Sequence, residues 1–165
     1  MILDLRDNPG GVVHAAGDAA EILFTGGTHF VTLRGRDDKN EKFSTFGLPP
    51  RTREGSQYTK MPMVVLVNEK TASAAEILAG ALQDHRRAVI VGERTLGKAS
   101  IQQVARLQLR PEVGVRLTVA RYFTPNGRMI QGEGITPDIV VEKDEALGRA
   151  LEILKAAKIF LKEEK

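Results

Sequence analysis

The fold is decided by the stretch Asn68-Glu-Lys-Thr-Ala-Ser73-Ala-Ala-Glu-Ile-Leu-Ala-Gly80. It follows the purely apolar run Met63–Val67 and begins a segment with helical spacing, so it predicts a buried strand, a tight turn and a helix over about residues 71–85. Ser73 then lies in the first turn of the helix, where unsatisfied backbone N–H groups and the helix dipole favour an oxyanion. Ser73 and Glu76 also form the pattern of a capping box, so a nucleophile and a plain cap are both open interpretations.

Two further apolar runs, Met1–Leu5 and Ala88–Val91, flank this unit along the chain. The first run ends in the turn Arg6–Gly11, and residues 12–23 then show helical spacing. Continuous apolar strands that alternate with helices are typical of a mainly parallel sheet covered on both faces. The Asn-Pro-Gly-Gly end of the turn can present backbone N–H groups to an anion, or it is a turn without a ligand.

The remaining sequence predicts additional, antiparallel strands. Residues 28–34 and 41–46 are expected to form a hairpin, and residues 47–61 a surface loop that could line a cleft. Alternating apolar residues over Val113–Ala120 predict a half-buried strand, paired with a strand over residues 101–109. The chain is then expected to continue with a turn at Thr124–Gly127, a short edge strand at Pro137–Val141 and a helix from about Asp144 to Leu161.

Composition excludes several classes of site. The chain has 165 residues, of which 42% are hydrophobic, and this suits one globular domain with its own core. The absence of cysteine excludes a thiol nucleophile and a disulfide framework, and three widely spaced histidines give no metal-binding pattern, so we expect neither metal nor cofactor. A net charge of +3 without a block of like charges argues against nucleic-acid binding. No membrane-spanning run and no signal-peptide pattern is found, which leaves the compartment open.

A second candidate for chemistry lies in the loop Gly92–Ser100, directly after the third apolar run. Its Gly-Lys-Ala-Ser ending resembles a phosphate-binding loop but fails the pattern, because Ala99 stands where Ser or Thr must follow the lysine. Lys98 is therefore either a solvated surface charge or the general base of a serine nucleophile. The second role requires burial that lowers the lysine pKa from about 10.4 toward neutrality. Gln102 or Gln103 is available to orient it.

Four segments in order resemble the C-terminal processing peptidases, also called tail-specific proteases. The resemblance covers most of residues 1–141. The four segments are Leu3-Asp-Leu-Arg-Asp-Asn-Pro-Gly-Gly11, Val67-Asn-Glu-Lys-Thr-Ala-Ser-Ala-Ala-Glu-Ile77, Val91-Gly-Glu-Arg-Thr-Leu-Gly-Lys-Ala-Ser-Ile-Gln102 and Tyr122-Phe-Thr-Pro-Asn-Gly-Arg-Met-Ile-Gln-Gly-Glu-Gly-Ile-Thr-Pro-Asp-Ile-Val140.

The resemblance implies a serine endopeptidase with a Ser–Lys dyad on a crotonase-like or ClpP-like α/β spiral. It makes Ser73 the nucleophile, Lys98 the general base and Gln102 the residue that supports the lysine. It implies an oxyanion hole formed by the backbone N–H of Ala74 and an N–H of the Gly10-Gly11 pair, with the choice of glycine open. Expected substrates are proteins with apolar, unstructured C-terminal tails, and most members of the family are exported or lumenal.

The sequence also departs from the pattern of that family. Ala99 and Ala75 replace a frequent glycine and a frequent serine, and both are small enough to leave the chemistry intact. The upstream PDZ domain and the first strand and helix of the family's core are not present, so we expect residues 1–165 to be one N-terminally incomplete catalytic domain. An inactive module that binds peptides or assembles with copies of itself is the alternative. An acyl-CoA-binding crotonase relative is a third and weaker one.

Overall fold

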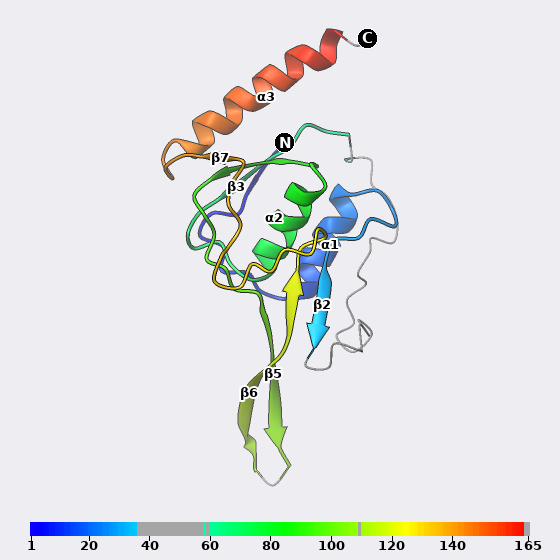
Figure 1. Cartoon of the computed structure of the whole chain (residues 1–165), viewed down its shortest axis with the longest axis vertical. Coiled ribbons are helices and arrows are strands. Elements are labelled where there is room, and N and C mark those ends of the chain that lie inside the picture. The colour runs from blue at the N-terminus through cyan, green and yellow to red at the C-terminus, as the bar shows by residue number, and fades with distance from the viewer. Residues whose placement is uncertain (36–57, 59, 109, 164–165) are drawn as a thin grey trace.

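The chain forms an α/β fold with one parallel and one antiparallel sheet (Figure 1). The computed structural model describes residues 1–35, 58, 60–108 and 110–163. The parallel sheet has the strand order β1-β3-β4-β7. Its strands are β1 (Ile2–Asp4), β3 (Val64–Val67), β4 (Val89–Gly92) and β7 (Ile139–Val140). All three of its pairings are parallel, and β7 is an edge strand, so the predicted sheet is confirmed.

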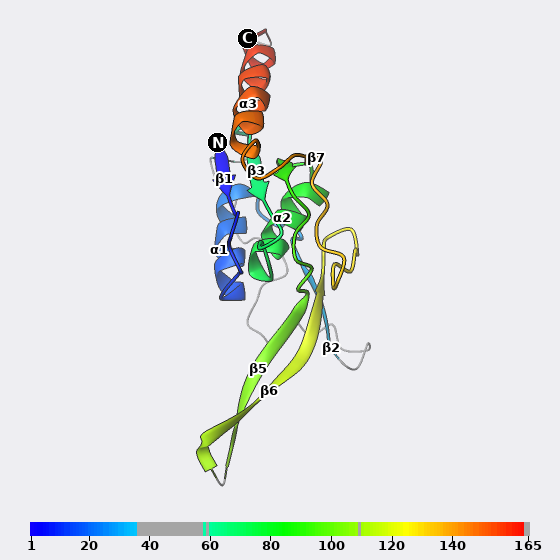
Figure 2. The same ribbon diagram turned by 90° about the vertical axis from the view of Figure 1, so that its left-hand side faces the viewer.

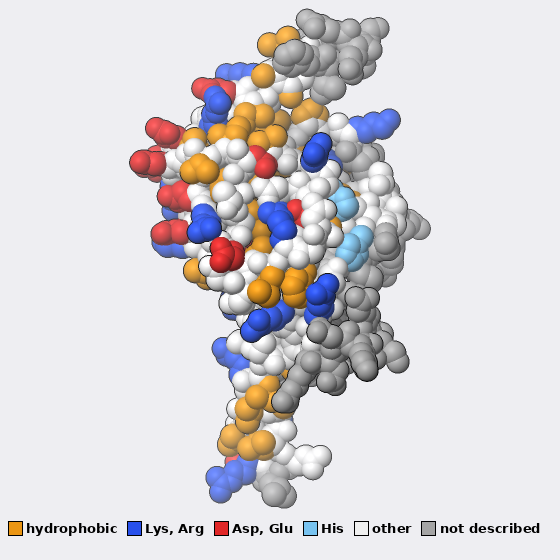
Figure 3. All heavy atoms as spheres, viewed as in Figure 1, with side chains coloured by type: hydrophobic (Ala, Val, Ile, Leu, Met, Phe, Trp, Pro, Cys, Tyr) orange, Lys and Arg blue, Asp and Glu red, His pale blue; other side chains and the backbone are white. Residues whose placement is uncertain are grey.

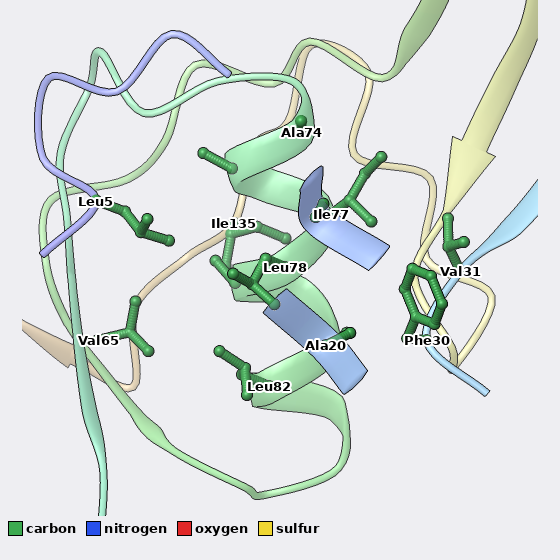
Figure 4. Close-up of a cluster of buried hydrophobic side chains, with 14 of the residues drawn as sticks. Leu5, Ala20, Phe30, Val31, Val65, Ala74, Ile77, Leu78, Leu82 and Ile135 are labelled. Carbon is green, nitrogen blue, oxygen red and sulfur yellow. The ribbon is translucent and has the colours of Figure 1, made fainter. Parts of the chain in front are cut away.

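Helices cover both faces of the parallel sheet. Side chains along a buried strand alternate between the two faces, so β3 contributes to both cores. One face of β3, with Val65 and Val67, belongs to the larger core beneath α1 (Val13–Leu23) and α2 (Ala74–Asp84). Figure 4 shows Leu78 and Leu82 of α2 in this core, together with Ala20 of α1 and Leu5. The opposite face packs against α3 (Ala146–Glu163).

Only the first turns of α3 are well covered. Ala146 and Ala150 are fully buried against the sheet, whereas Leu147 and Leu151 of the predicted apolar stripe are 45% exposed. In Figures 1 and 2 the helix continues outward beyond the body of the fold. In the described part of the chain, no helix is long and apolar enough to cross a membrane.

The antiparallel sheet has the strand order β2-β6-β5. Its strands are β2 (Thr32–Gly35), β5 (Ser100–Leu107) and β6 (Arg110–Phe123). The predicted pairing of the last two strands is confirmed, but β6 is longer than its alternating core suggested. The strand expected from Thr28 begins at Thr32, because a turn in which the Thr28 N–H bonds to the Thr25 carbonyl precedes it. The strand expected at residues 41–46 and nearly all of the 47–61 loop lie outside the described residues.

Strands β5 and β6 extend together as an arm that projects from the body, away from α3 (Figure 2). Orange side chains lie along this arm in Figure 3. The exposed large apolar residues of the arm are Val104, Leu107, Val113, Val115 and Leu117. A two-stranded ribbon by itself is marginally stable in water. The arm is therefore the part of the fold that is least supported by the core.

The bend after β4 depends on Gly92, which has a φ of +130°. A Cβ atom at this position would lie 2.1 Å from the Val67 carbonyl oxygen, so we expect Gly92→Ala to lower the free energy of unfolding by roughly 3 kcal/mol or more. Gly148→Ala is the matched control, because its Cβ meets open space on α3 and should raise stability by about 0.5–1 kcal/mol. Urea unfolding of the two variants checks both expectations, and equal stabilities would contradict them.

Candidate active site

Ser73 lies at the junction between β3 and α2, in a strained backbone conformation. It is the N-cap of α2, with φ 55° and ψ −120°, a region that residues other than glycine rarely adopt. The helix consequently begins at Ala74, three residues later than predicted, and Ser73 caps the helix instead of lying in its first turn. Strain of this kind at a half-buried hydroxyl is a common mark of a functional residue.

The turn before Ser73 is fixed by hydrogen bonds to the segment that directly follows β1. The Thr71 hydroxyl donates to the Leu5 carbonyl at 2.8 Å, and the Ala72 N–H donates to the Asn8 carbonyl at 3.0 Å. The Asn68 amide and Asp7 exchange two further bonds, at 2.9 and 3.0 Å. These contacts hold the glycine turn of the first segment beside Ser73, as expected for adjacent parallel strands.

Gly10 packs so closely against Ser73 that it leaves no room for a side chain. Its φ is +90°, and a Cβ atom there would lie 2.7 Å from the Ser73 Cβ and 2.8 Å from the Ala74 nitrogen. The Gly10 N–H donates to Asn8 Oδ1 at 2.9 Å. Within the described part of the chain, the N–H groups of Gly11 and Ala74 have no acceptor. Two backbone donors are thus available on either side of Gly10.

Glu76 is a residue whose role the sequence analysis missed beyond its capping. Its side chain is fully buried, and Oε2 accepts hydrogen bonds from the backbone N–H groups of both Ser73 and Lys98, each at 2.9 Å. Oε1 accepts from the Gly97 N–H at 2.7 Å and the Thr95 hydroxyl at 2.5 Å. Because Ser73 and Lys98 bind the same oxygen, their backbone nitrogens cannot lie farther apart than twice that 2.9 Å distance.

Tyr122 is a second residue that the sequence analysis quoted without assigning a role. It lies on β6, is 1% exposed, and its hydroxyl lies 3.0 Å from the Ser73 carbonyl oxygen and also contacts the Lys98 carbonyl. Burial raises the pKa of the Tyr122 phenol, and the neighbouring Glu76 carboxylate raises it further. The phenol is therefore a neutral donor at physiological pH. The sequence indicates this role of Tyr122 only weakly, because an aromatic residue in an alternating strand usually belongs to the core.

The exposure of Lys98 differs from the expectation that the fold buries a lysine that acts as a base. Its neighbours Gly97 and Ala99 are buried, but Lys98 itself is exposed, since it alternates with them along the loop after β4. The described residues of this chain therefore do not supply the desolvation that a neutral lysine requires.

Gln102 is exposed too, and it lies next to a β-bulge. Ile101 pairs with Ala120 and Gln102 pairs with Thr118, so the extra residue at this register shift is Val119 of β6. β5 has no extra residue here, so Gln102 lies on the same face as Ser100, two residues earlier. Gln103 pairs with Leu117 on the opposite face.

An apolar cavity of about 250 Å³ lies beside the glycine turn. Gly10, Gly11 and Ala74 line it together with residues of both helices, of β1 and of the segment between β1 and α1. The helical residues are Ala15, Ala16, Ala19, Ala75 and Leu78, and the others are Leu3, Leu5, Asn8 and Val12. A chain bound at Ser73 would find small, mostly apolar walls here.

Comparison with known proteins assigns the sequence to one group. The model of peptidase family S41 matches residues 1–141. The chain is 44% identical over 142 residues to the carboxy-terminal-processing protease of Bartonella bacilliformis, and 46% identical over 142 residues to the carboxyl-terminal-processing protease of Synechocystis. These matches cover 86% of this chain but only 31% of each relative, so the chain spans about a third of their length.

Solved structures agree with the sequence matches. The photosystem II D1 C-terminal processing protease superimposes with a TM-score of 0.73 at 38% identity, over 90% of this chain and 37% of that one. A lipoprotein from Streptococcus agalactiae has a TM-score of 0.72 at 22% identity, over 94% of this chain and 54% of that one, and shares the fold alone.

The Glu76 contacts predict a large effect of removing its second acceptor oxygen. In Glu76→Gln an NH₂ group would replace an oxygen that accepts two donors, so we expect a loss of roughly 2–4 kcal/mol in the free energy of unfolding. Glu69→Gln, at an exposed position of the same turn, should change it by less than about 0.5 kcal/mol. Chemical denaturation measures both, and a Glu76→Gln protein as stable as the control would show that the carboxylate does not hold the two segments.

Proposed function

The chain belongs to peptidase family S41, and we propose that it is a serine-peptidase catalytic core in which Ser73 and Lys98 form the dyad. The observation that carries this proposal is the Glu76 oxygen shared by the backbones of these two residues. It fixes an otherwise exposed loop lysine beside a strained serine, which neither a helix cap nor a solvated charge requires. The curated relatives, carboxyl-terminal-processing proteases, support the same reaction class.

In the proposed reaction, neutral Lys98 accepts the Ser73 hydroxyl proton while Oγ attacks a peptide carbonyl carbon. The carbonyl oxygen becomes an oxyanion, for which we assign the N–H groups of Ala74 and Gly11, because the Gly10 N–H is already donated to Asn8. Loss of one such donor costs roughly 3–4 kcal/mol in comparable sites. Collapse of the intermediate breaks the C–N bond, and the leaving amine takes the proton from Lys98. A water molecule, deprotonated in the same way, then hydrolyses the acyl-enzyme.

Because Lys98 is exposed in the structure, we assign the substrate a further role in catalysis. A lysine is a base only in its neutral form, and desolvation favours that form. We infer that the bound polypeptide covers Lys98 and that Gln102, which follows it closely along the chain at the start of β5, orients the amine. Catalysis and substrate binding are then coupled, because a bound polypeptide favours the neutral form of the base.

The apolar cavity beside Gly11 supports a preference for small apolar side chains next to the cleaved bond. Alanine walls contributed by α1 and α2 restrict its width, and no charged residue lines it. Proteins with apolar C-terminal tails are therefore the proposed substrates. Residues 1–165 are proposed to act as one catalytic unit.

A fluorophosphonate probe, which reacts with activated serines, tests the dyad. We expect labelling of the unmodified chain and of Lys70→Ala, which removes an exposed lysine from the same turn as Ser73. Ser73→Ala should abolish labelling, and Lys98→Ala should reduce it by at least about 100-fold. Labelling that survives in Ser73→Ala, or that is equal in the two lysine variants, would exclude the proposed pair. Mass spectrometry of the labelled peptide identifies the modified residue.

The exposed arm favours a second candidate function, self-assembly. In the pairing register of β5 and β6, Ala105 lies opposite Val115 and Gln103 opposite Leu117, so Val115 and Leu117 share one face. Both residues are more than 40% exposed. If this face binds a second copy, sedimentation will show a concentration-dependent dimer that Leu117→Lys abolishes. A monomer at all concentrations would exclude the second function without affecting the first.

A further inference from the structure

We propose that Tyr122 is a positioning residue, which holds Ser73 and Lys98 in register with each other by binding both of their backbone carbonyl groups. This inference deepens the proposed function and depends on it for the roles of the two residues. The geometry that supports it is independent of those roles.

The contacts of Tyr122 converge on the two segments that form the candidate site. Its hydroxyl lies 3.0 Å from the Ser73 carbonyl oxygen and also contacts the carbonyl oxygen of Lys98. Its backbone N–H donates to the Ala99 carbonyl at 3.0 Å. One side chain from the antiparallel sheet therefore contacts both the start of α2 and the loop after β4, although 49 and 24 positions separate it from the two residues.

Tyr122 and Glu76 each contact main-chain groups of both Ser73 and Lys98. The Glu76 carboxylate accepts both N–H groups, and the Tyr122 hydroxyl binds both carbonyls. The Ser73 carbonyl also accepts the backbone N–H groups of Glu76 and Ile77. A carboxylate has only acceptors, whereas a phenol supplies the donor that carbonyls need. The peptide groups before and after each of the two residues are thus both held. This resists relaxation of the positive φ of Ser73 toward an ordinary backbone conformation.

The protonation state of Tyr122 fits this role. An ionised phenolate would face two carbonyl oxygens without a proton to share. The pKa of the Tyr122 phenol is raised by burial and by the Glu76 carboxylate, so the proton stays on the hydroxyl at neutral and moderately alkaline pH.

Tyr122→Phe tests the proposal, because it removes the hydroxyl and keeps the buried ring. Tyr58→Phe is the matched control, as it removes the same atom from a residue that is 40% exposed. Hydrogen exchange with mass spectrometry on the full chain reports the two segments directly. We expect exchange over residues 71–77 and 94–100 to rise about tenfold in Tyr122→Phe, the change that corresponds to one typical buried hydrogen bond, while β3 and α3 remain unchanged.

Fluorophosphonate labelling gives the second measurement. Per folded molecule, Tyr122→Phe should label about tenfold more slowly, because the loosened loop holds Lys98 in line with Ser73 for a smaller fraction of the time. A purely structural role would lower the folded fraction and leave the labelling rate per folded molecule in place.

The outcomes separate this proposal from the proposed function. Exchange that is unchanged, or raised evenly over the whole chain, overturns the positioning role, as does a labelling rate per folded molecule equal to that of Tyr58→Phe. If the unmodified chain is not labelled at all, the dyad fails, and the exchange data alone then decide on Tyr122. A rise in hydrogen exchange confined to residues 71–77 and 94–100 supports the positioning role of Tyr122, and the absence of such a rise overturns it.

Discussion

The buried carboxylate of Glu76 is the interaction on which the candidate site depends. A charge removed from water costs several kcal/mol unless donors replace its hydration. Three backbone N–H groups and one hydroxyl do so here, and all but one of these donors belong to the loop after β4. The start of α2 adds the favourable end of the helix dipole. The loop after β4 must therefore pack against the start of α2, because the buried Glu76 carboxylate would otherwise lack most of its donors. This packing brings the backbone of Lys98 close to that of Ser73.

Much of the fold could be predicted from the sequence, because local patterns determine it. Continuous apolar runs between helical segments led to the parallel sheet, and the alternation within residues 113–120 led to the long strand β6. The partner of β2 could not be predicted, since β2 pairs with β6, far along the chain. The projection of the arm had no local signal either, because its apolar alternation looks like that of a strand that packs on a core.

The candidate site, too, could be predicted only where local sequence patterns determine it. Ser73, Lys98 and the glycine turn could be found from their positions after apolar strands and from the family resemblance. The role of Glu76 was hidden by a simpler one, because a capping box accounts for a glutamate at that position. Its bonds to Gly97 and Lys98, like those of Tyr122, connect residues that are distant in sequence. The exposure of Lys98 depends on how the loop after β4 lies over the fold, and the spacing of residues along the sequence does not determine this.

The regular alternation at the start of β5 has a consequence for the lengths that this segment can adopt in evolution. Side chains of a strand alternate between faces, so one added or deleted residue exchanges every face beyond it. Between Lys98 and Gln102, such a change would turn Gln102 to the other face of β5 and move the apolar residues of β5 to the other side of the arm. At the tip of the arm, beyond Leu107, the connection can change length without moving Gln102. Insertions should therefore accumulate at the tip and be purged from the few residues next to Lys98.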